Sequence, residues 1–242
     1  EIMPSLVGSE MCIRDSSYVD DTEYYIELLK NRGLNDKMIL SFFKQACANY
    51  SRYGLTTLMT QANNQDMLLI PDPSALLTTL SDQTYIGAYV PHNLVLMSDI
   101  HRLKYAMYLN NDAYEALKKM IDAMPNEIAN DFYVKEAYTS FTDLQYSNPN
   151  LAGKDERQLG HTVSIASKSI AYHEFETAAL SQWLEAHSYE YGFILRYPKR
   201  MASSTNHVYD AHYYRYVGKK NANKIYKENS CIEEYNQKEA AE

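Results

Sequence analysis

Two short stretches of the chain hold the side chains best suited to chemistry. They span residues 157–164 and 210–215, and their members that can ionise, bind or attack are Arg157, His161, Ser164, Asp210, His212, Tyr213 and Arg215. A metal-dependent hydrolytic site needs several protein ligands, a bound water and a carboxylate that takes the proton of that water. Arg157 is a permanent cation that repels a metal ion. The two stretches therefore carry reactive side chains without an evident set of metal ligands.

Two predicted strands position the second stretch. Residues 193–197 form a short, almost wholly apolar run that Pro198 closes, which is typical of a buried strand ending at a turn. A polar connection follows at residues 203–206. The chain returns at residues 213–217, which are rich in side chains that fit a pleated surface, and the strand stops at Gly218. Two strands with a polar excursion between them predict the wall and rim of a site.

These stretches resemble one known family. Residues 191–198 read YGFILRYP and residues 210–218 read DAHYYRYVG. They resemble the signature of the VanY-type D-alanyl-D-alanine carboxypeptidases, zinc peptidases that trim peptidoglycan stem peptides, in which the second half reads EPWHYRYVG. Residues 155–165, DERQLGHTVSI, resemble the family's first zinc motif, SEHQTGLAVDI. The resemblance covers roughly residues 67–236.

The resemblance implies a fold. We expect an α+β protein of the D-Ala-D-Ala carboxypeptidase and hedgehog-like kind, with a small, mostly antiparallel sheet flanked by helices and an N-terminal helical hairpin. Residues 5–16 resemble a translated sequencing adaptor, so residues 1–16 are expected to be an artefact of sequence assembly. Residues 17–62 are then a helical appendage, residues 67–236 the carboxypeptidase-like domain, and residues 237–242 a tail.

The resemblance also assigns positions to the family's zinc site. The two histidine ligands fall on Arg157 and Tyr213, the aspartate ligand falls on Ser164, and the general base falls on Asp210. Ser164 is a poor neutral ligand, and Tyr213 must first lose a proton whose reference pKa is about 10. The family's arginine for the substrate carboxylate falls on Thr139, which carries no charge. We therefore expect no metal and no cofactor, although zinc serves the family.

Two alternatives remain for this pocket. In one, His161 and His212 replace the lost zinc ligands, but neighbouring side chains on a strand point to opposite faces, so His212 is expected to face away. In the other, Arg157 pairs with Asp210 and the salt bridge stands in for zinc; Arg157 pointing into solvent is the competing possibility. The predicted pocket residues are Tyr138, Thr139, Ser140, Arg157, His161, Ser164, His212, Tyr213 and Arg215, with Asp210 at the position of the base.

Composition and charge limit the kinds of molecule that the chain is expected to bind. The chain has 242 residues, 45% of them apolar, which is enough for a sizeable core. A formal net charge of −8 without a basic cluster argues against nucleic acid. No run is long and apolar enough to span a bilayer, so membrane attachment is expected only through a missing N-terminal anchor. By resemblance we expect an extracytoplasmic protein of the bacterial cell envelope.

Local signals predict further elements. Asn35 is a candidate N-cap after a helix that stops at Gly33, and Asp112 is a candidate cap for a helix over 112–124. We also expect a strand over 133–141, a polar turn over 145–153 and a helix over 175–189 that stops at Gly192. Ser230 and Glu233 have the spacing of a capping box.

Three functions follow from these residues. The first is a non-catalytic relative of the carboxypeptidases that binds a peptidoglycan stem peptide or a related ligand. The second is an active zinc D-Ala-D-Ala carboxypeptidase with a rearranged metal site. The third is a structural domain without a ligand. Fold alone does not decide among them, because the site is the part that has changed.

Overall fold

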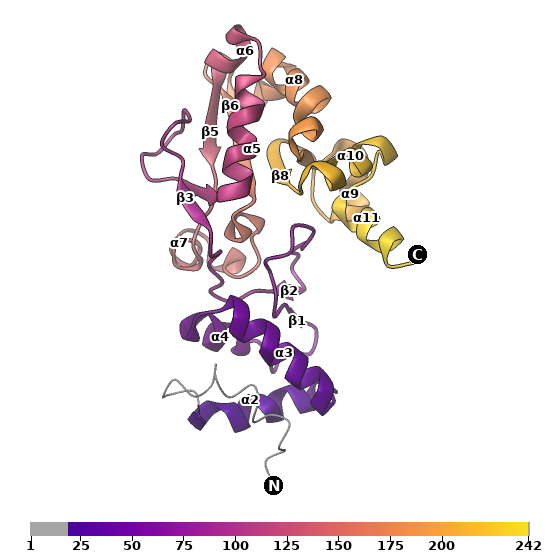
Figure 1. Cartoon of the computed structure of the whole chain (residues 1–242). Helices are drawn as coiled ribbons and strands as arrows, with labels where there is room; N and C mark the ends of the chain where they lie inside the picture. Colours follow the sequence, from indigo (N-terminus) through magenta and orange to yellow (C-terminus); the bar gives the residue numbers. More distant parts are fainter. Residues whose placement is uncertain (1–18, 242) are drawn as a thin grey trace. The chain divides into compact units, whose positions relative to one another are not determined.

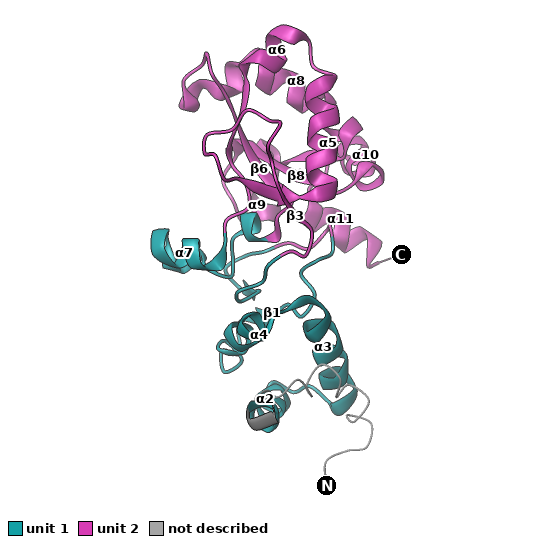
Figure 2. Ribbon diagram, turned by 60° about the vertical axis from the view of Figure 1, so that its left-hand side comes forward, with its two compact units in different colours: residues 1–75, 80–90, 140–158 teal, residues 76–79, 91–139, 159–242 magenta. Residues whose placement is uncertain are grey.

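The computed structural model describes residues 19–241, and the side chains of residues 21–241. The chain divides into two compact units, shown in Figures 1 and 2. The described part of unit 1 is residues 19–75, 80–90 and 140–158, and that of unit 2 is residues 76–79, 91–139 and 159–241. The predicted α+β fold with small antiparallel sheets is confirmed. The predicted artefact at residues 1–16 lies outside the described residues, and the predicted domain boundaries stay predictions.

Unit 1 begins with the expected helices, α2 (Val19–Asn31), α3 (Asp36–Asn49) and α4 (Arg52–Met59). Gly33 takes a positive φ of 81° after α2, a conformation that suits glycine. The Asn35 side chain caps α3 by accepting a 3.0 Å hydrogen bond from the backbone N–H of Met38. The predicted helical hairpin and the Asn35 cap are therefore confirmed.

The rest of unit 1 is short elements and loops. β1 (Leu68–Leu69) and β2 (Thr84–Tyr85) pair in parallel, and α7 (Phe141–Ser147) precedes the 3₁₀ turns η2 (Pro149–Leu151) and η3 (Glu156–Leu159). The polar turn predicted over 145–153 is wrong at residues 145–147, which belong to α7, and right for the turns that follow. Ser140 caps α7: its hydroxyl accepts a 3.1 Å hydrogen bond from the backbone N–H of Asp143. Composition alone did not reveal this helix start.

Unit 2 is built on a four-stranded antiparallel sheet in the order β5-β6-β8-β7. Its strands are β5 (Phe132–Glu136), β6 (Thr162–Ser167), β7 (Phe193–Tyr197) and β8 (Asp210–Tyr216). A separate hairpin pairs β3 (Leu94–Leu96) with β4 (Tyr108–Asn110). The helices and 3₁₀ turns are α5 (Asn111–Asp122), α6 (Asn126–Asp131), η4 (Tyr172–Thr177), α8 (Ala179–His187), η5 (Ser188–Tyr191), η6 (Lys199–Met201), α9 (Ala202–Thr205), α10 (Lys219–Glu228) and α11 (Ile232–Glu239).

Apolar packing covers one face of this sheet. Val163 and Ile165 of β6 and Phe193 of β7 are fully buried there, against side chains of α5 and α8. Figure 1 shows α5 lying along the sheet. On β7 the alternate residue Ile194 joins a smaller cluster with Ile225 of α10 and Ile232 of α11. The strand predicted at 193–197 is confirmed. Because its side chains alternate between the two faces, Phe193 packs in the main core and Ile194 in the smaller one.

Several predicted boundaries in unit 2 shift. The strand expected over 133–141 ends at Glu136, and the cap of α5 is Asn110 instead of Asp112. The helix expected over 175–189 is split into η4 and α8 because Ala178 is extended, although Gly192 does stop the following turn with a φ of 93°. Within the described part of the chain, no helix combines the length and apolar character that crossing a membrane needs.

The predicted capping box at Ser230 and Glu233 is also wrong. α11 begins after Cys231, which makes no side-chain cap. The Glu233 carboxylate instead accepts two hydrogen bonds from the guanidinium of Arg196, at 3.1 and 2.5 Å. Arg196 is almost fully buried, so this bidentate pair stabilises a charge that would otherwise be costly to bury. A tertiary partner has displaced the local cap.

Candidate functional site

A row of three polar residues crosses the other face of the unit 2 sheet. Glu136 of β5 pairs with Ser164 of β6, and Ser164 pairs with Tyr213 of β8. Directly opposed residues project from the same face, so the three side chains lie side by side. The Tyr213 hydroxyl donates a 2.6 Å hydrogen bond to Oε2 of Glu136. This bond joins the two strands that flank β6 and passes over Ser164.

Ser164 is the buried centre of this row. Its side chain has no exposed surface, and its hydroxyl finds no hydrogen-bond partner among the described residues. Tyr172 lies close by. Burial raises the pKa of Tyr172, the Ser164 hydroxyl opposes the rise without meeting the geometry of a hydrogen bond, and the charges of Asp210 and Glu136 add to it. Two carboxylates and three hydroxyls therefore gather at one place.

Ring stacking holds Tyr172 in position. Its ring lies parallel to the His212 imidazole, with centroids 3.6 Å apart and planes 3° apart. The Lys135 ammonium sits 3.2 Å from the centroid of the Tyr172 ring, which is a cation–π contact. The Tyr172 ring thus makes contacts with both β5 and β8, although 40% of the residue remains exposed. It is the most accessible of the hydroxyl-bearing residues around Ser164.

His212 is engaged by the backbone. Its Nδ1 lies 2.7 Å from the carbonyl oxygen of Ile165, and its Nε2 lies 2.9 Å from the carbonyl oxygen of Tyr172. The backbone N–H of His212 donates a 2.9 Å hydrogen bond to Oδ1 of Asp210, which fixes that carboxylate at the start of β8. Both ring nitrogens face acceptors, so this arrangement leaves no lone pair directed at a metal.

His161 and Arg215 lie together at the other end of the pairing between β6 and β8. Arg215 is fully buried, and its Nη2 donates to the carbonyl oxygens of Leu76 and Thr78, at 3.2 and 3.3 Å. Burial first, and the Arg215 charge second, lower the pKa of His161 to about 3. Nδ1 of this neutral imidazole has no hydrogen-bond partner among the described residues. His161 is therefore a buried neutral base behind the row.

Two predicted pocket residues follow β5. Tyr138 is half-buried, and its backbone N–H donates to the carbonyl oxygen of Tyr108. The Thr139 hydroxyl donates a 3.2 Å hydrogen bond to the carbonyl oxygen of Ala137, so it serves the local backbone. The third, Ser140, belongs to unit 1, where it caps α7.

Arg157 also belongs to unit 1. Its Nε donates a 2.9 Å hydrogen bond to Oδ1 of Asp155, and its Nη2 donates a 2.6 Å bond to Oδ2. This fork geometry is the strong form of an arginine–carboxylate pair. The sequence analysis expected Arg157 either to pair with Asp210 or to point into solvent, and it did not identify Asp155 as the partner. Arg157 and Asp210 belong to different units, so their predicted pairing stays a prediction.

The residues at the family's ligand positions do not fit zinc. Arg157 is a cation bound to Asp155, and Tyr213 retains the proton that it donates to Glu136. Ser164 offers a neutral hydroxyl, which is a weak zinc donor. Over residues 19–241, no three histidine, cysteine, aspartate or glutamate side chains are grouped so that they could hold a metal ion.

Sequence reasoning missed three members of the site. They are Lys135, Glu136 and Tyr172. Glu136 was inside a predicted strand, but its link to Tyr213 depends on the register across β6, which also contains an irregularity between Val134 and Glu136. Tyr172 reaches the site from a 3₁₀ turn, for which the sequence carried no signal.

Comparison with known proteins points to a single family. The profile of the VanY D-alanyl-D-alanine carboxypeptidase family matches residues 144–219. A D-alanyl-D-alanine carboxypeptidase of Enterococcus faecalis is 30% identical over 192 residues, which cover 75% of this chain and 70% of that protein. YodJ of Bacillus subtilis, which carries a provisional carboxypeptidase name, is 28% identical over 191 residues and 70% of each chain.

Solved structures agree on the fold. The LdcB LD-carboxypeptidase, whose structure addresses peptidoglycan recognition, superposes with a TM-score of 0.63 and 27% identity, covering 69% of this chain and 88% of that one. The vancomycin resistance D,D-pentapeptidase VanY was solved in complex with Zn(II); it has a TM-score of 0.50 and 24% identity, and covers 68% of this chain and 99% of that one. This zinc complex contradicts the expectation that no cofactor belongs to this protein. Zinc is the cofactor to test, even though the donor set described above does not match it.

Proposed function

The chain belongs to the family of VanY-type D-alanyl-D-alanine carboxypeptidases, and from this premise we propose that it binds a peptidoglycan stem peptide, or a related peptide, without hydrolysing it. One observation carries the proposal. The Tyr213 hydroxyl is hydrogen-bonded to Glu136 across Ser164, so side chains at two of the family's ligand positions form a closed polar row. The fold of the family is retained, while other residue types stand at the positions of its zinc ligands.

The polar row of Glu136, Ser164 and Tyr213 suits a peptide ligand, together with Asp210 and Tyr172 beside it. The carboxylates of Glu136 and Asp210 accept hydrogen bonds from amide or ammonium N–H groups, and the Tyr172 hydroxyl both donates and accepts. Thr139 supplies no charge for a terminal carboxylate. We infer that the affinity comes from the peptide's N–H groups more than from its C-terminal carboxylate. That LdcB is described in terms of peptidoglycan recognition supports the choice of ligand.

A direct test uses a pentapeptide stem that ends in D-Ala-D-Ala. Isothermal titration of the purified chain is expected to show binding, and chromatography of the same mixture is expected to show no release of D-alanine. Asp210→Asn should weaken binding, because it removes one acceptor charge, while Tyr105→Ala, at a tyrosine that is 84% exposed and outside the row, should not. Binding that Asp210→Asn leaves unchanged would count against the polar row and the adjoining Asp210 as the site.

The second candidate function is an active zinc carboxypeptidase. The zinc complex of the solved relative and the carboxylate retained at Asp210 favour it. Elemental analysis of the purified chain discriminates between the two: an equivalent of zinc, together with D-alanine release that a chelator abolishes, supports the enzyme. The triple variant Arg157→His, Ser164→Asp and Tyr213→His restores the family's ligand types, so it should bind zinc more tightly than the natural chain.

The proposed ligand also sets the expected location. Peptidoglycan stems lie outside the cytoplasmic membrane, so we propose an extracytoplasmic protein of the bacterial cell envelope. Fractionation of cells that express the full-length gene, followed by immunodetection, tests this; recovery in the cytoplasmic fraction alone would contradict it.

A further inference from the structure

A groove of about 710 Å³ runs along the open edge of the unit 2 sheet, apart from the polar row. β7 is the last strand of the sheet, so its outer edge pairs with no other strand among the described residues. α8 and η5 line one side of the groove, and α10 with the turn after it lines the other. The groove therefore offers backbone polar groups of β7 at its floor and helical side chains on its walls.

The walls carry hydrogen-bonding groups of several kinds. α8 contributes the Gln182 amide and the Glu185 carboxylate, and the turn after α10 contributes the Asn229 amide. Tyr189 and Tyr226 stack on each other, with ring centroids 3.7 Å apart and planes 11° apart. Tyr226 is 47% exposed, so part of this aromatic pair is open to a ligand. Planar amides, a carboxylate and an aromatic surface together match the hydroxyls and C–H faces of sugars.

Ser230 gives the groove an unsatisfied polar group. It lines the groove and is 7% exposed, and its hydroxyl has no hydrogen-bond partner within residues 19–241. The capping role that its sequence position predicted is absent, because α11 begins after Cys231. A buried hydroxyl without a partner costs free energy unless a ligand or water satisfies it. The groove wall therefore contains a buried polar group whose partner is not among the described residues, and the Ser230→Ala variant below tests whether a ligand serves it.

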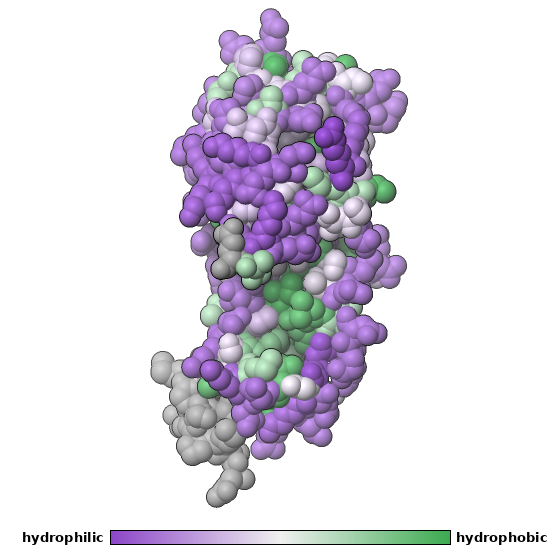
Figure 3. Space-filling view, turned by 90° about the vertical axis from the view of Figure 1, so that its right-hand side faces the viewer, coloured by the Kyte–Doolittle hydropathy of each residue, from purple (hydrophilic) through white to green (hydrophobic). Residues whose placement is uncertain are grey.

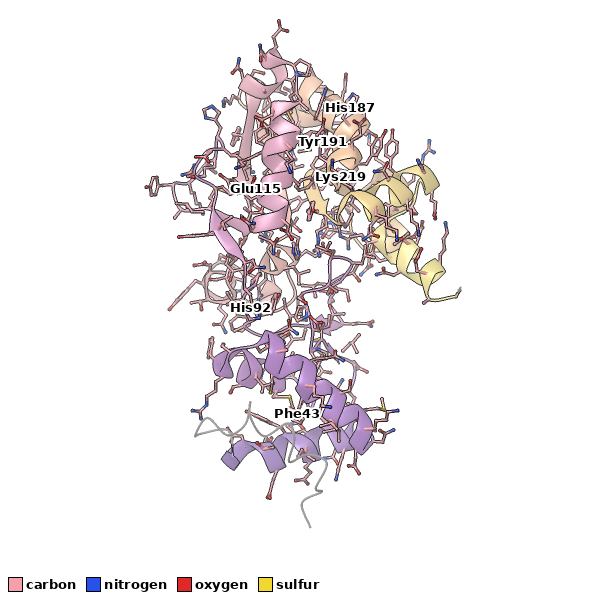
Figure 4. The ribbon with its side chains drawn as sticks, viewed as in Figure 1. Phe43, His92, Glu115, His187, Tyr191 and Lys219 are labelled. Carbon is pink, nitrogen blue, oxygen red and sulfur yellow. The ribbon has the colours of Figure 1, made fainter. Side chains whose placement is uncertain are left out.

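The walls are braced. Trp183 of α8 lies 6.4 Å from the Tyr191 ring, centroid to centroid, and the Lys219 ammonium at the start of α10 lies 5.8 Å from the centroid of the same ring. Figure 4 shows Tyr191 and Lys219 near each other, with His187 above them on α8. These contacts tie α8 to α10 through η5. A preformed groove loses less entropy when a ligand binds.

We propose that this groove binds a saccharide chain of N-acetylated amino sugars, as a second site beside the one for the stem peptide. Figure 3 shows that the face which α10 and α11 present is largely hydrophilic over unit 2, which suits a sugar better than an apolar peptide. The choice of N-acetylated amino sugars rests on the proposed function, because the glycan strands of peptidoglycan consist of them. One chain would then contact both components of the polymer.

Isothermal titration with chitotetraose, a soluble tetramer of N-acetylglucosamine, tests the proposal on the full chain. We expect binding, and we expect maltotetraose, which lacks the acetamido groups, to bind at least about tenfold more weakly. Tyr226→Ala should weaken chitotetraose binding by about tenfold, because it removes the open aromatic ring. Tyr105→Ala, an equally drastic change at an exposed tyrosine outside the groove, should leave it unchanged. No binding of chitotetraose, or equal loss in both variants, would overturn the proposal.

Ser230→Ala separates a ligand contact from a structural role. If the Ser230 hydroxyl serves a ligand, its removal lowers chitotetraose affinity and leaves the free energy of unfolding unchanged or higher, since an unsatisfied buried group is lost. Lower stability with unchanged affinity would contradict the assignment. Stem-peptide titration of the same variants keeps the two proposals apart: Tyr226→Ala should not affect the peptide, and Asp210→Asn should not affect the saccharide.

Discussion

The two faces of the unit 2 sheet differ in what fills them. One face is apolar, and Val163, Ile165 and Phe193 have no exposed surface beneath the helices. The other carries Glu136 and Tyr213 in a hydrogen bond across the buried Ser164. The apolar face fixes where the strands lie, and the polar face uses those strands to set distances between functional groups. A site can therefore change its chemistry while the face behind it preserves the geometry.

The strongest test of this difference is Phe193→Ala on the apolar face. Phe193 is fully buried against the main core, so its truncation should lower the free energy of unfolding by about 3–5 kcal/mol. Urea unfolding followed by circular dichroism measures the change. A loss below about 1 kcal/mol would mean that this face does not hold the sheet together.

Acid should expose the next largest effect, at the buried His161. The pKa of His161 is lowered to about 3 in the folded protein, against about 6.5 in the unfolded chain. Below pH 6.5 the unfolded chain therefore binds a proton at His161 while the folded protein does not, and this favours unfolding. The free energy of unfolding is therefore unaffected by His161 above pH 6.5, and it falls as the pH drops from 6.5 toward 3. At pH 5 the loss is about 2 kcal/mol, from roughly 1.5 pH units at 1.36 kcal/mol each.

His161→Gln is the matched control, because glutamine stays neutral throughout this range. The free energy of unfolding of the natural chain should fall more steeply between pH 7 and 5 than that of the variant. Parallel pH profiles would show that protons reach His161 in the folded protein, and that it is less buried than the structure indicates.

A smaller effect is expected from Tyr213→Phe on the polar face. The change removes the hydroxyl that Glu136 accepts from, and because Glu136 is half-buried it regains some contact with water. The free energy of unfolding should fall by about 1 kcal/mol, less than for Phe193→Ala. If the two variants are equally destabilised, the polar row is a structural element of the sheet and not a surface free to serve a ligand.

The smallest effect on stability concerns the cation above Tyr172. Lys135→Ala removes the ammonium that lies 3.2 Å from the ring centroid, which should lower stability by about 0.5–1 kcal/mol and also weaken stem-peptide binding. Lys118→Ala is the matched control, since Lys118 lies 4.9 Å from the Tyr114 ring, on α5 and outside the site. It should change stability alone; an equal effect of both variants on peptide binding would argue against a role for Tyr172.

Local pattern predicted much of the scaffold. The apolar run before Pro198, the stop at Gly192 and the cap at Asn35 were all confirmed, because each depends on residues within one turn or one strand. Boundaries failed where a distant contact or an extended residue intervened, as at the end of β5 and at Ala178. The helix α7 was missed because its start depends on the Ser140 cap inside a polar stretch.

By itself, the sequence determined the family resemblance. It also determined that Arg157, Ser164 and Tyr213 stand where the family has its zinc ligands, since both conclusions follow from residue identity alone. The tertiary structure decided what those residues do. It joined Tyr213 to Glu136, which lies 77 positions away in the sequence, and it left the Ser230 hydroxyl in a groove wall instead of at a helix cap. The reason is physical: the partner of a polar group is set by strand register and by competition among distant side chains, and neither is encoded in local periodicity.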